Sequence, residues 1–458
     1  MDPHLHNESL TSAVLANVYD GLTELDHHFG IRAALAAGWS NPDEKTWVFR
    51  IRPAVAFHDG RPLTAGDVVF SLERARHHPE SGLASYLVEV ESVREIDPLT
   101  VEVRTRRPFA PLLAKLTPVY IVPRGAPSRI EDPVGTGPYR LVQSGGEFVR
   151  MVPAERDWRG GHAGAPLTFV VEPRPDERLR LLLSGEVDVA ADLDEIAVKV
   201  LEKVECCSGL VRPGSAVEYL HLGASDPRFD DRRVRRALHL ALARPALVAR
   251  TLEGWGEAAS QLASPGTVGF APTIRAPVRD VPEARRLLAE AGHPRGFSVT
   301  LDFREDRRAE EIQRQLAEAG IEVTLRPGAW ADVLGRVRSG EAHFYYGAFT
   351  ADTGDAGDIL DSALHTPEPA AGLGVDNHFG YSSPDVDRLL LAARNAPTLP
   401  DRRQALQRVM KQVMADLPMI PLVVPHDLYV VRRDVRWTPR LDGRVLAADL
   451  ARAPEGRP

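Results

Sequence analysis

Three carboxylates follow closely on an aromatic segment in the last third of the 458-residue chain. Residues 343–349 are typical of a strand, and Asp352, Asp355 and Asp358 come after its end. A carboxylate at a strand end that is shielded from water can accept a charge-assisted hydrogen bond from a cationic ligand. The alternative is that these carboxylates cap turns and helices on a solvated loop.

The residues that could bind a metal or catalyse a reaction lack the required spacing. The histidines that lie near one another are His4 with His6, His27 with His28, and His77 with His78. None of these pairs has the i, i+4 spacing of helical zinc motifs, so we expect solvated or hydrogen-bonded side chains. The Gly-Thr-Gly run at 135–137 continues with Pro138, which favours a tight turn over a phosphate loop. With no Gly-x-Ser-x-Gly elbow either, we expect no enzyme, no metal and no cofactor.

The only cysteines are neighbours, Cys206 and Cys207. Adjacent Cα atoms lie about 3.8 Å apart, whereas Cα atoms across a disulfide usually lie roughly 4.4–6.8 Å apart. No further metal ligands are near at a recognisable spacing. We therefore predict two free thiols and a fold held together by its hydrophobic cores.

The composition is that of a soluble globular protein, with 43% hydrophobic and 26% charged residues. The net charge is −8 and both signs are spread along the chain, whereas a nucleic-acid-binding surface needs clustered Lys and Arg. The most apolar stretch, 237–249, is interrupted by Arg244 and Pro245, and a membrane span needs about 20 apolar residues. No export signal opens the chain, so we expect either a cytoplasmic protein or a chain without its export segment.

The length predicts two or three lobes. A strand is expected at 47–52, a helix at 65–76 that begins with a Thr64–Asp67 capping box, and a hairpin at 93–104. Further strands are expected at 148–152, 299–303, 321–325 and 343–349, and further helices at 232–243, 282–291, 306–320, 330–337, 384–395 and 401–416. Beyond residue 280 strands alternate with helices, which predicts a largely parallel sheet covered by helices, in a multi-lobed α/β or α+β protein.

The most distinctive stretch is 57–71, with the sequence Phe-His-Asp-Gly-Arg-Pro-Leu-Thr-Ala-Gly-Asp-Val-Val-Phe-Ser. Other distinctive segments lie at 17–22, 135–139, 234–238, 284–297 and 380–387. In this order they resemble the blocks of solute-binding protein family 5, the peptide-binding family of ATP-binding-cassette importers. Members of that family capture oligopeptides, dipeptides, nickel complexes, opines and some sugars.

The resemblance implies a two-lobed periplasmic-binding-protein-like fold of type II, α/β in class, with an inserted subdomain. Lobe I would comprise 1–24, 135–228 and 424–458, the insert 25–134, and lobe II 229–423. Segments near 219–225 and 421–425 would join the lobes, and the ligand would lie between them, since ligand sites favour domain interfaces.

The resemblance also implies which residues hold the ligand. In peptide-binding relatives an aromatic residue is followed three positions later by an aspartate that receives the peptide's α-ammonium, and Phe349 and Asp352 match these positions. Dipeptide binders place an arginine for the ligand carboxylate just before the helix that begins here near Asp306, which makes Arg304 a candidate. The further candidates for ligand contact are Tyr346, Thr350, Tyr19, Asp20 and Tyr381. For the last three, core packing or a structural hydrogen bond is the alternative.

The function that the resemblance implies is capture of a small polar solute, above all a peptide, by hinge closure and its delivery to a membrane permease. Such a protein would be periplasmic or otherwise extracytoplasmic, with or without a lipid anchor, and would be a monomer that does not itself insert into the membrane. Nickel complexes, opines and oligosaccharides are the alternative ligands. The alternative functions are a ligand-sensing module of a cytoplasmic transcription regulator and a peptide-hydrolysing enzyme.

Overall fold

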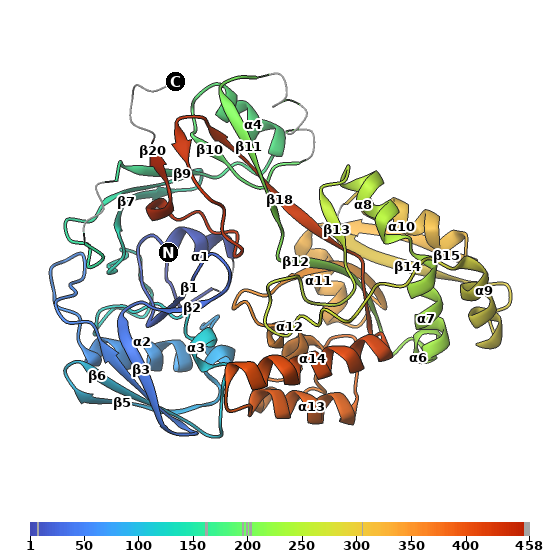
Figure 1. The fold of residues 1–458 in the computed structure, drawn as a ribbon, viewed down its shortest axis with the longest axis horizontal. Helices are drawn as coiled ribbons and strands as arrows, with labels where there is room; N and C mark the ends of the chain where they lie inside the picture. Colours follow the sequence, from blue (N-terminus) through green and yellow to red (C-terminus); the bar gives the residue numbers. More distant parts are fainter. Residues whose placement is uncertain are drawn as a thin grey trace. The chain divides into compact units, whose positions relative to one another are not determined.

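The computed structural model describes residues 1–6, 9–160, 164–194, 197, 200, 204–304 and 306–452 (Figure 1). The chain forms two compact units, the first from Met1–Arg212 with Asp427–Pro458 and the second from Pro213–His426. It therefore passes between the units twice. The resemblance places the corresponding lobe boundaries at 228/229 and 423/424, and these boundaries and the insert at 25–134 stay predictions.

The first unit contains a four-stranded antiparallel sheet covered by a helix. The sheet has the order β3 (Ala36–Asp43), β4 (Thr46–Ile51), β6 (Thr100–Thr105), β5 (Val90–Asp97). Apolar side chains such as Phe49 and Val103 are buried in a core shared with α2 (Ala65–His77). The backbone N–H and hydroxyl of Thr64 both donate to the Asp67 carboxylate, which confirms the predicted capping box.

Smaller elements make up the rest of the first unit. These are α1 (Ser9–Leu15), β1 (Thr23–Leu25), β2 (Ile31–Ala33), a 3₁₀ turn (Ala84–Leu87), α3 (Leu112–Lys115), β7 (Tyr139–Gly145), β8 (Phe148–Pro153), β9 (Leu167–Val170), α4 (Pro175–Leu183), β10 (Val189–Ala190), β11 (Cys207–Pro213), β18 (Val423–Arg432), β19 (Val435–Arg436), a 3₁₀ turn (Ala447–Asp449) and β20 (Ala451–Arg452). The central strand β18 lies between β10 and β11. Its first residues, 423–425, belong to the second unit and pair there with β13 (Gly256–Ala258).

A five-stranded mixed sheet organises the second unit (Figure 1). Its order is β15 (Ile321–Gly328), β14 (Phe297–Arg304), β16 (Phe344–Thr350), β12 (Ala216–Leu222), β17 (Met419–Pro421). Strand β14 is parallel to β15 and β16, whereas β12 is antiparallel to β16 and β17. Because β17 and β16 are both antiparallel to β12, β17 runs in the same direction as β14, β15 and β16. The prediction of a largely parallel sheet is therefore right for four strands and wrong for β12 alone. Strand β12 comes before the alternating strand-helix run, so the run carries no information on its direction.

Helices cover both faces of this sheet. One layer contains α7 (Arg232–Ala241), α8 (Arg244–Thr251), α9 (Val281–Glu290) and α10 (Arg308–Ala317), preceded by the short α6 (Pro227–Asp230), and the other contains α11 (Trp330–Arg338), α12 (Gly357–Ala363), α13 (Pro384–Arg394) and α14 (Leu399–Asp416), with a 3₁₀ turn at Pro369–Ala371. Along β16, Phe344 and Tyr346 pack in the first layer, and Tyr345 and Phe349 pack in the second. This alternation follows from the period-2 geometry of a strand. The predicted mixed α/β class is confirmed.

Glycines at 135–137 allow two backbone segments of the first unit to approach closely. The N–H of Gly137 donates to the carbonyl of Val18 at 2.9 Å. A Cβ atom on Gly135 would lie 1.9 Å from the same carbonyl oxygen. At the predicted tight turn, two segments of the same chain therefore pass close to each other. Glycine is needed there because it has no side chain.

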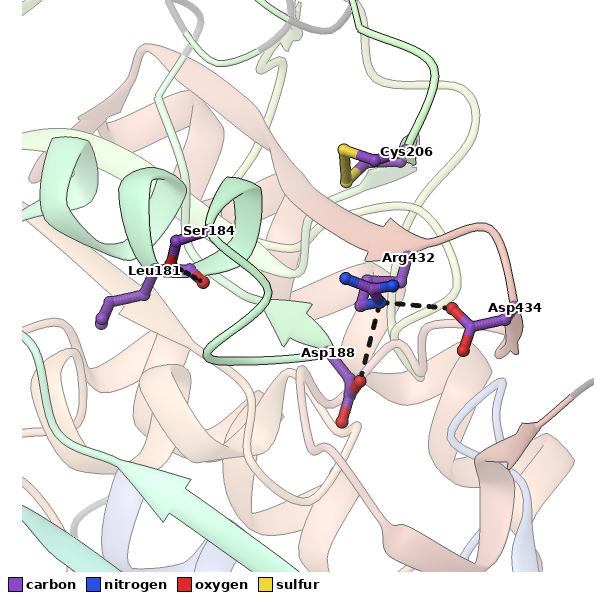
Figure 2. The surroundings of a disulfide bond; sticks show 7 residues. Leu181, Ser184, Asp188, Cys206, Arg432 and Asp434 are labelled. Atoms are coloured by element: carbon purple, nitrogen blue, oxygen red, sulfur yellow. Dashed lines mark hydrogen bonds and ion pairs between the residues drawn. A yellow bond between two sulfur atoms is a disulfide. The ribbon is translucent and has the colours of Figure 1, made fainter.

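The prediction of two free thiols is wrong, because Cys206 and Cys207 form a disulfide (Figure 2). Their Cα atoms are 3.8 Å apart, as in any pair of neighbours joined by a trans peptide. The usual Cα range across a disulfide describes residues brought together by folding. Neighbouring cysteines instead close a small ring through their shared peptide bond. The usual range of Cα–Cα distances does not exclude such a ring.

Candidate ligand-binding site

The carboxyl ends of the three parallel strands form one edge of the sheet in the second unit. Strand β14 ends at Arg304, β15 ends at Gly328, and these residues lie opposite each other. Strand β16 ends at Thr350. Ligands of open α/β sheets bind outside the carboxyl ends of the strands. This edge is therefore where the second unit is expected to carry binding residues.

The aromatic residue and the aspartate implied by the resemblance lie at this edge. Phe349 is opposite Val217 of β12 and is half-buried against the core of α11–α14. Thr350 is the last residue of β16, and Asp352 follows two positions later, each partly exposed. The structure thus brings Phe349, Thr350 and Asp352 to one strand end.

The two other carboxylates of this loop serve the fold. Asp355 accepts hydrogen bonds from Nε and Nη2 of Arg402 at 2.7 and 2.8 Å and from the N–H of Gly357 at 2.7 Å. Asp358 accepts from the N–H and the hydroxyl of Thr353 at 3.0 and 2.8 Å. These contacts account for Asp355 and Asp358 as structural groups, which was the alternative interpretation of the acidic loop.

Tyr346 lies on the opposite face of β16 from Phe349. It is 5% exposed, and its hydroxyl donates to Oε2 of Glu218 at 2.6 Å. Nε of Arg308 donates to the Tyr346 hydroxyl at 2.8 Å and lies 2.9 Å from Oε2 of Glu218. The structure therefore places Tyr346 in a buried polar network and not beside Phe349.

Two arginines flank the loop after β14. Arg304 is exposed at the end of the strand. Arg308, the first residue of α10, has a side chain only 18% exposed, held by Glu218 and by Asp306 through Nη2 at 2.6 Å. Asp306 also accepts the N–H of Arg308 at 2.7 Å. Arg308 was not among the predicted ligand residues, although the Asp306-x-Arg308 spacing is a signal that one aspartate can accept a backbone N–H at a helix start and also pair with an arginine.

Burial raises the pKa of Glu218 from its usual 4.5 to about 7, although Arg308 and Tyr346 pull the pKa down. The folded protein then binds this proton more tightly than the unfolded chain does. The free energy of unfolding should therefore fall as the pH rises from 4.5 to about 7, by at most about 1.4 kcal/mol per pH unit. We expect Glu218→Gln to remove this fall in urea unfolding curves recorded across the pH range. Glu310→Gln, at an exposed position of α10, should retain it, and an unchanged pH profile in Glu218→Gln would contradict the assignment.

The remaining candidates in the first unit are Tyr19 and Asp20. Tyr19 is 1% exposed and its ring stacks on that of Tyr120, with centroids 6.0 Å apart. Asp20 is 4% exposed and accepts from the Thr136 hydroxyl at 2.8 Å and from the Trp158 indole N–H at 3.0 Å. It also pairs with Arg159 at 2.5 Å. These contacts are those of core packing and structural hydrogen bonding, the alternative stated for both residues.

Tyr381, the last candidate, belongs to the second unit. Its hydroxyl donates to Oδ2 of Asp416 at 2.9 Å, and its N–H donates to Asn377 at 3.0 Å. It is partly buried against the core of α11–α14. The structure shows a residue that ties α14 to the preceding loop and does not place it with Phe349 and Asp352.

Two properties of the described residues concern metals and membranes. Among these residues no group of three or more His, Cys, Asp or Glu side chains is placed to hold a metal ion. Within the same ranges, none of the helices has both the length and the apolar character that a membrane span requires.

Solved structures of binding proteins share this fold. The ABC-transporter-associated periplasmic binding protein DppA from Helicobacter pylori, in complex with the peptide STSA, has a TM-score of 0.84 at 23% identity, with 98% of this chain and 95% of that chain covered. The dipeptide-binding protein from Pseudoalteromonas sp. SM9913, in complex with Met-Leu, has a TM-score of 0.85 at 21% identity, with 98% and 97% covered. The fold is thus that of substrate-binding proteins of importers.

The family follows from sequence comparison. The model of the bacterial extracellular solute-binding proteins, family 5, matches residues 30–370. The glutathione-binding protein GsiB of Escherichia coli strain K12 is 28% identical over 451 residues, which cover 93% of this chain and 86% of that protein. The chain belongs to the bacterial extracellular solute-binding proteins of family 5, whose members are the binding components of ATP-binding-cassette importers. This confirms the resemblance and favours the importer over the transcription regulator.

Proposed function

We propose that this protein captures a short peptide or peptide-like solute outside the cytoplasm and delivers it to the permease of an ATP-binding-cassette importer. Family membership supports the class of function. The relatives that support a peptide are named for glutathione, or were solved with the peptide STSA or with Met-Leu. We propose that the chain acts as a monomer and catalyses no reaction on the solute.

The observation that carries this proposal is the placement of Asp352 with Phe349 at the carboxyl edge of the sheet. A carboxylate there provides the negative charge that an α-ammonium group needs, and the ring of Phe349 provides apolar contact for the adjoining side chain. Arg304, exposed at the neighbouring strand end, is proposed to face the ligand carboxylate. Thr350 would add a hydroxyl for a backbone group of the ligand. For Tyr346, Tyr19, Asp20 and Tyr381 we propose structural roles, on the contacts described above.

Capture is proposed to work by closure of the two units on the ligand. The chain joins them at only two places, Arg212–Pro213 and His426–Asp427, which suits a hinge because few backbone angles need to change. A ligand favours the closed form only to the extent that it binds that form more tightly. The closed form would then be the one that the permease recognises.

The test is a thermal-shift screen of the purified protein with dipeptides, longer peptides, glutathione, nickel complexes, opines and oligosaccharides. A ligand at about 100 times its Kd stabilises the folded state by about 2.7 kcal/mol, which gives a clear shift in Tm. We expect peptides to give the shift and their N-acetylated forms to give none, since acetylation removes the charge that Asp352 is proposed to bind. The peptides should be recovered uncleaved after incubation.

In the same screen Asp352→Ala should lose the shift with peptides, whereas Asp385→Ala, with a side chain 73% exposed on α13, should keep it. A full peptide shift in Asp352→Ala would refute the role of this aspartate. A shift with nickel complexes, opines or oligosaccharides, and none with any peptide, would refute the proposed ligand class.

A further inference from the structure

The disulfide between Cys206 and Cys207 occupies the start of a strand that leaves the first unit. Cys207 is the first residue of β11, which pairs with β18. The carbonyl of Cys206 accepts the N–H of Arg433, just beyond the end of β18, at 3.0 Å. The backbone from the Cys206 carbonyl onward is therefore held by the sheet and does not depend on the sulfur atoms.

The bond contributes little to holding this region together. A disulfide stabilises a fold mainly by closing a loop in the unfolded chain, and this effect grows with loop length. No residue lies between Cys206 and Cys207, so the loop is the shortest that a chain can form. Figure 2 shows the side-chain pairs of this region, in which Arg432 lies between Asp188 at 3.9 Å and Asp434 at 3.3 Å. These pairs join the end of β18 to the residue before β10 and do not involve the cysteine segment, which is held to β18 by strand pairing.

The two sulfur-bearing residues differ in exposure. Cys206 is exposed, whereas Cys207 is 3% exposed. A thiolate attacks a disulfide at an accessible sulfur, in line with the bond that breaks. Solvent thiols can therefore reach the sulfur of Cys206, and Cys207 becomes the leaving group.

We propose that Cys206–Cys207 is a reversible exchange site for low-molecular-weight thiols. A thiolate forms a bond to Sγ of Cys206, the Sγ–Sγ bond breaks, and its electron pair goes to Sγ of Cys207, which takes up a proton from solvent. A second thiolate attacks the sulfur of the bound thiol and releases the external disulfide, and Sγ of Cys206 leaves and is protonated. Two external thiols are oxidised to one disulfide, and the protein disulfide is reduced to two thiols.

The geometry also makes the exchange reversible. After the first step the thiol of Cys207 stays next to the mixed disulfide on Cys206, because the two residues share a peptide bond. Its return attack is intramolecular and is favoured by a high effective concentration. The inference concerns a region separate from the proposed peptide site and holds whichever solute is bound.

The first test uses the full chain purified without reductant and 2-mercaptoethanol as the thiol. We expect an intact mass that corresponds to the disulfide, no thiol that reacts with maleimide, and two reactive thiols after treatment of the folded protein. Oxidation with 2-hydroxyethyl disulfide should restore the starting mass. A folded protein that resists the thiol until it is denatured would overturn the proposal, as would two free thiols that this oxidant cannot join.

The second test uses serine variants. Cys207→Ser, which retains the exposed Cys206, should react with maleimide about tenfold faster than Cys206→Ser, which retains the buried Cys207, because reactivity follows exposure. The double variant Cys206→Ser/Cys207→Ser should show the same Tm as the parent. A marked fall in Tm in the double variant would show that the disulfide stabilises the fold and would overturn the proposal. Equal rates of maleimide reaction in the two single variants would contradict the assignment of Cys206 as the point of attack.

Discussion

Replacing Arg402 by methionine is expected to lower the free energy of unfolding by about 3–5 kcal/mol, because it leaves a buried carboxylate without its counter-charge. The Arg402 side chain is 1% exposed and that of Asp355 is 5% exposed. Two parallel hydrogen bonds join them, at 2.7 and 2.8 Å, and Nη1 of Arg402 donates to the carbonyl of Ala393 at 2.9 Å. Urea unfolding followed by circular dichroism measures the loss.

Two further variants separate the buried charge from other effects of the substitution. Arg403→Met changes the neighbouring, exposed arginine of α14 and should alter stability by no more than about 0.5 kcal/mol. Arg402→Met combined with Asp355→Asn should recover part of the loss, since the second change removes the unpaired charge. Equal stability of the single and double variants would show that packing, and not charge, sets the cost.

Asp20→Ala is expected to cost the first unit about 1–3 kcal/mol, since it leaves the buried Thr136 hydroxyl without its acceptor. The loss of the pair with Arg159 adds less, because that side chain is 29% exposed. One carboxylate 4% exposed satisfies the Thr136 hydroxyl, the Trp158 indole N–H and the guanidinium of Arg159. The substitution leaves all three donors without this acceptor. Urea unfolding monitored by tryptophan fluorescence should report it, because the Trp158 indole loses a hydrogen-bond partner.

The control for this prediction is Glu24→Gln. Glu24 lies 3.9 Å from the same guanidinium but its side chain is 43% exposed, so its contribution should be small. If Asp20→Ala were as stable as the parent and lost peptide binding in the thermal-shift screen, Asp20 would be a ligand residue and not a structural one.

Local sequence patterns predicted most of the helices and strands. The Thr64–Asp67 box gave the start of α2, and Gly292 and Gly320 stand after α9 and α10 with positive φ values of 93° and 92°. Such signals involve residues within one or two turns of each other, so a single sequence displays them. The overall fold came from the resemblance, because several distinctive segments matched the family in order.

The features that were missed depend on residues far apart in the chain. Arg402 and Asp355 are 47 positions apart, and Tyr346 and Glu218 are 128 positions apart. No local pattern indicates that these side chains come into contact. Whether a charged or polar side chain stabilises the fold or binds a ligand depends on its burial, which a local pattern does not give. The antiparallel direction of β12 was missed for the same reason, since its partner β16 lies more than a hundred residues later. The disulfide was missed because a distance rule for folded pairs was applied to neighbours.

The two units differ in when the ribosome completes them. The second unit is one continuous stretch, Pro213–His426, so all of its strands have been synthesised before the chain returns to the first. The first unit still lacks residues 427–432 of β18 at that time, and β18 is the strand that lies between β10 and β11. Strands β10 and β11 therefore lack β18 as a partner while the entire second unit is synthesised. A released chain that ends at His426 should contain the whole second unit and a first unit whose sheet lacks its central strand.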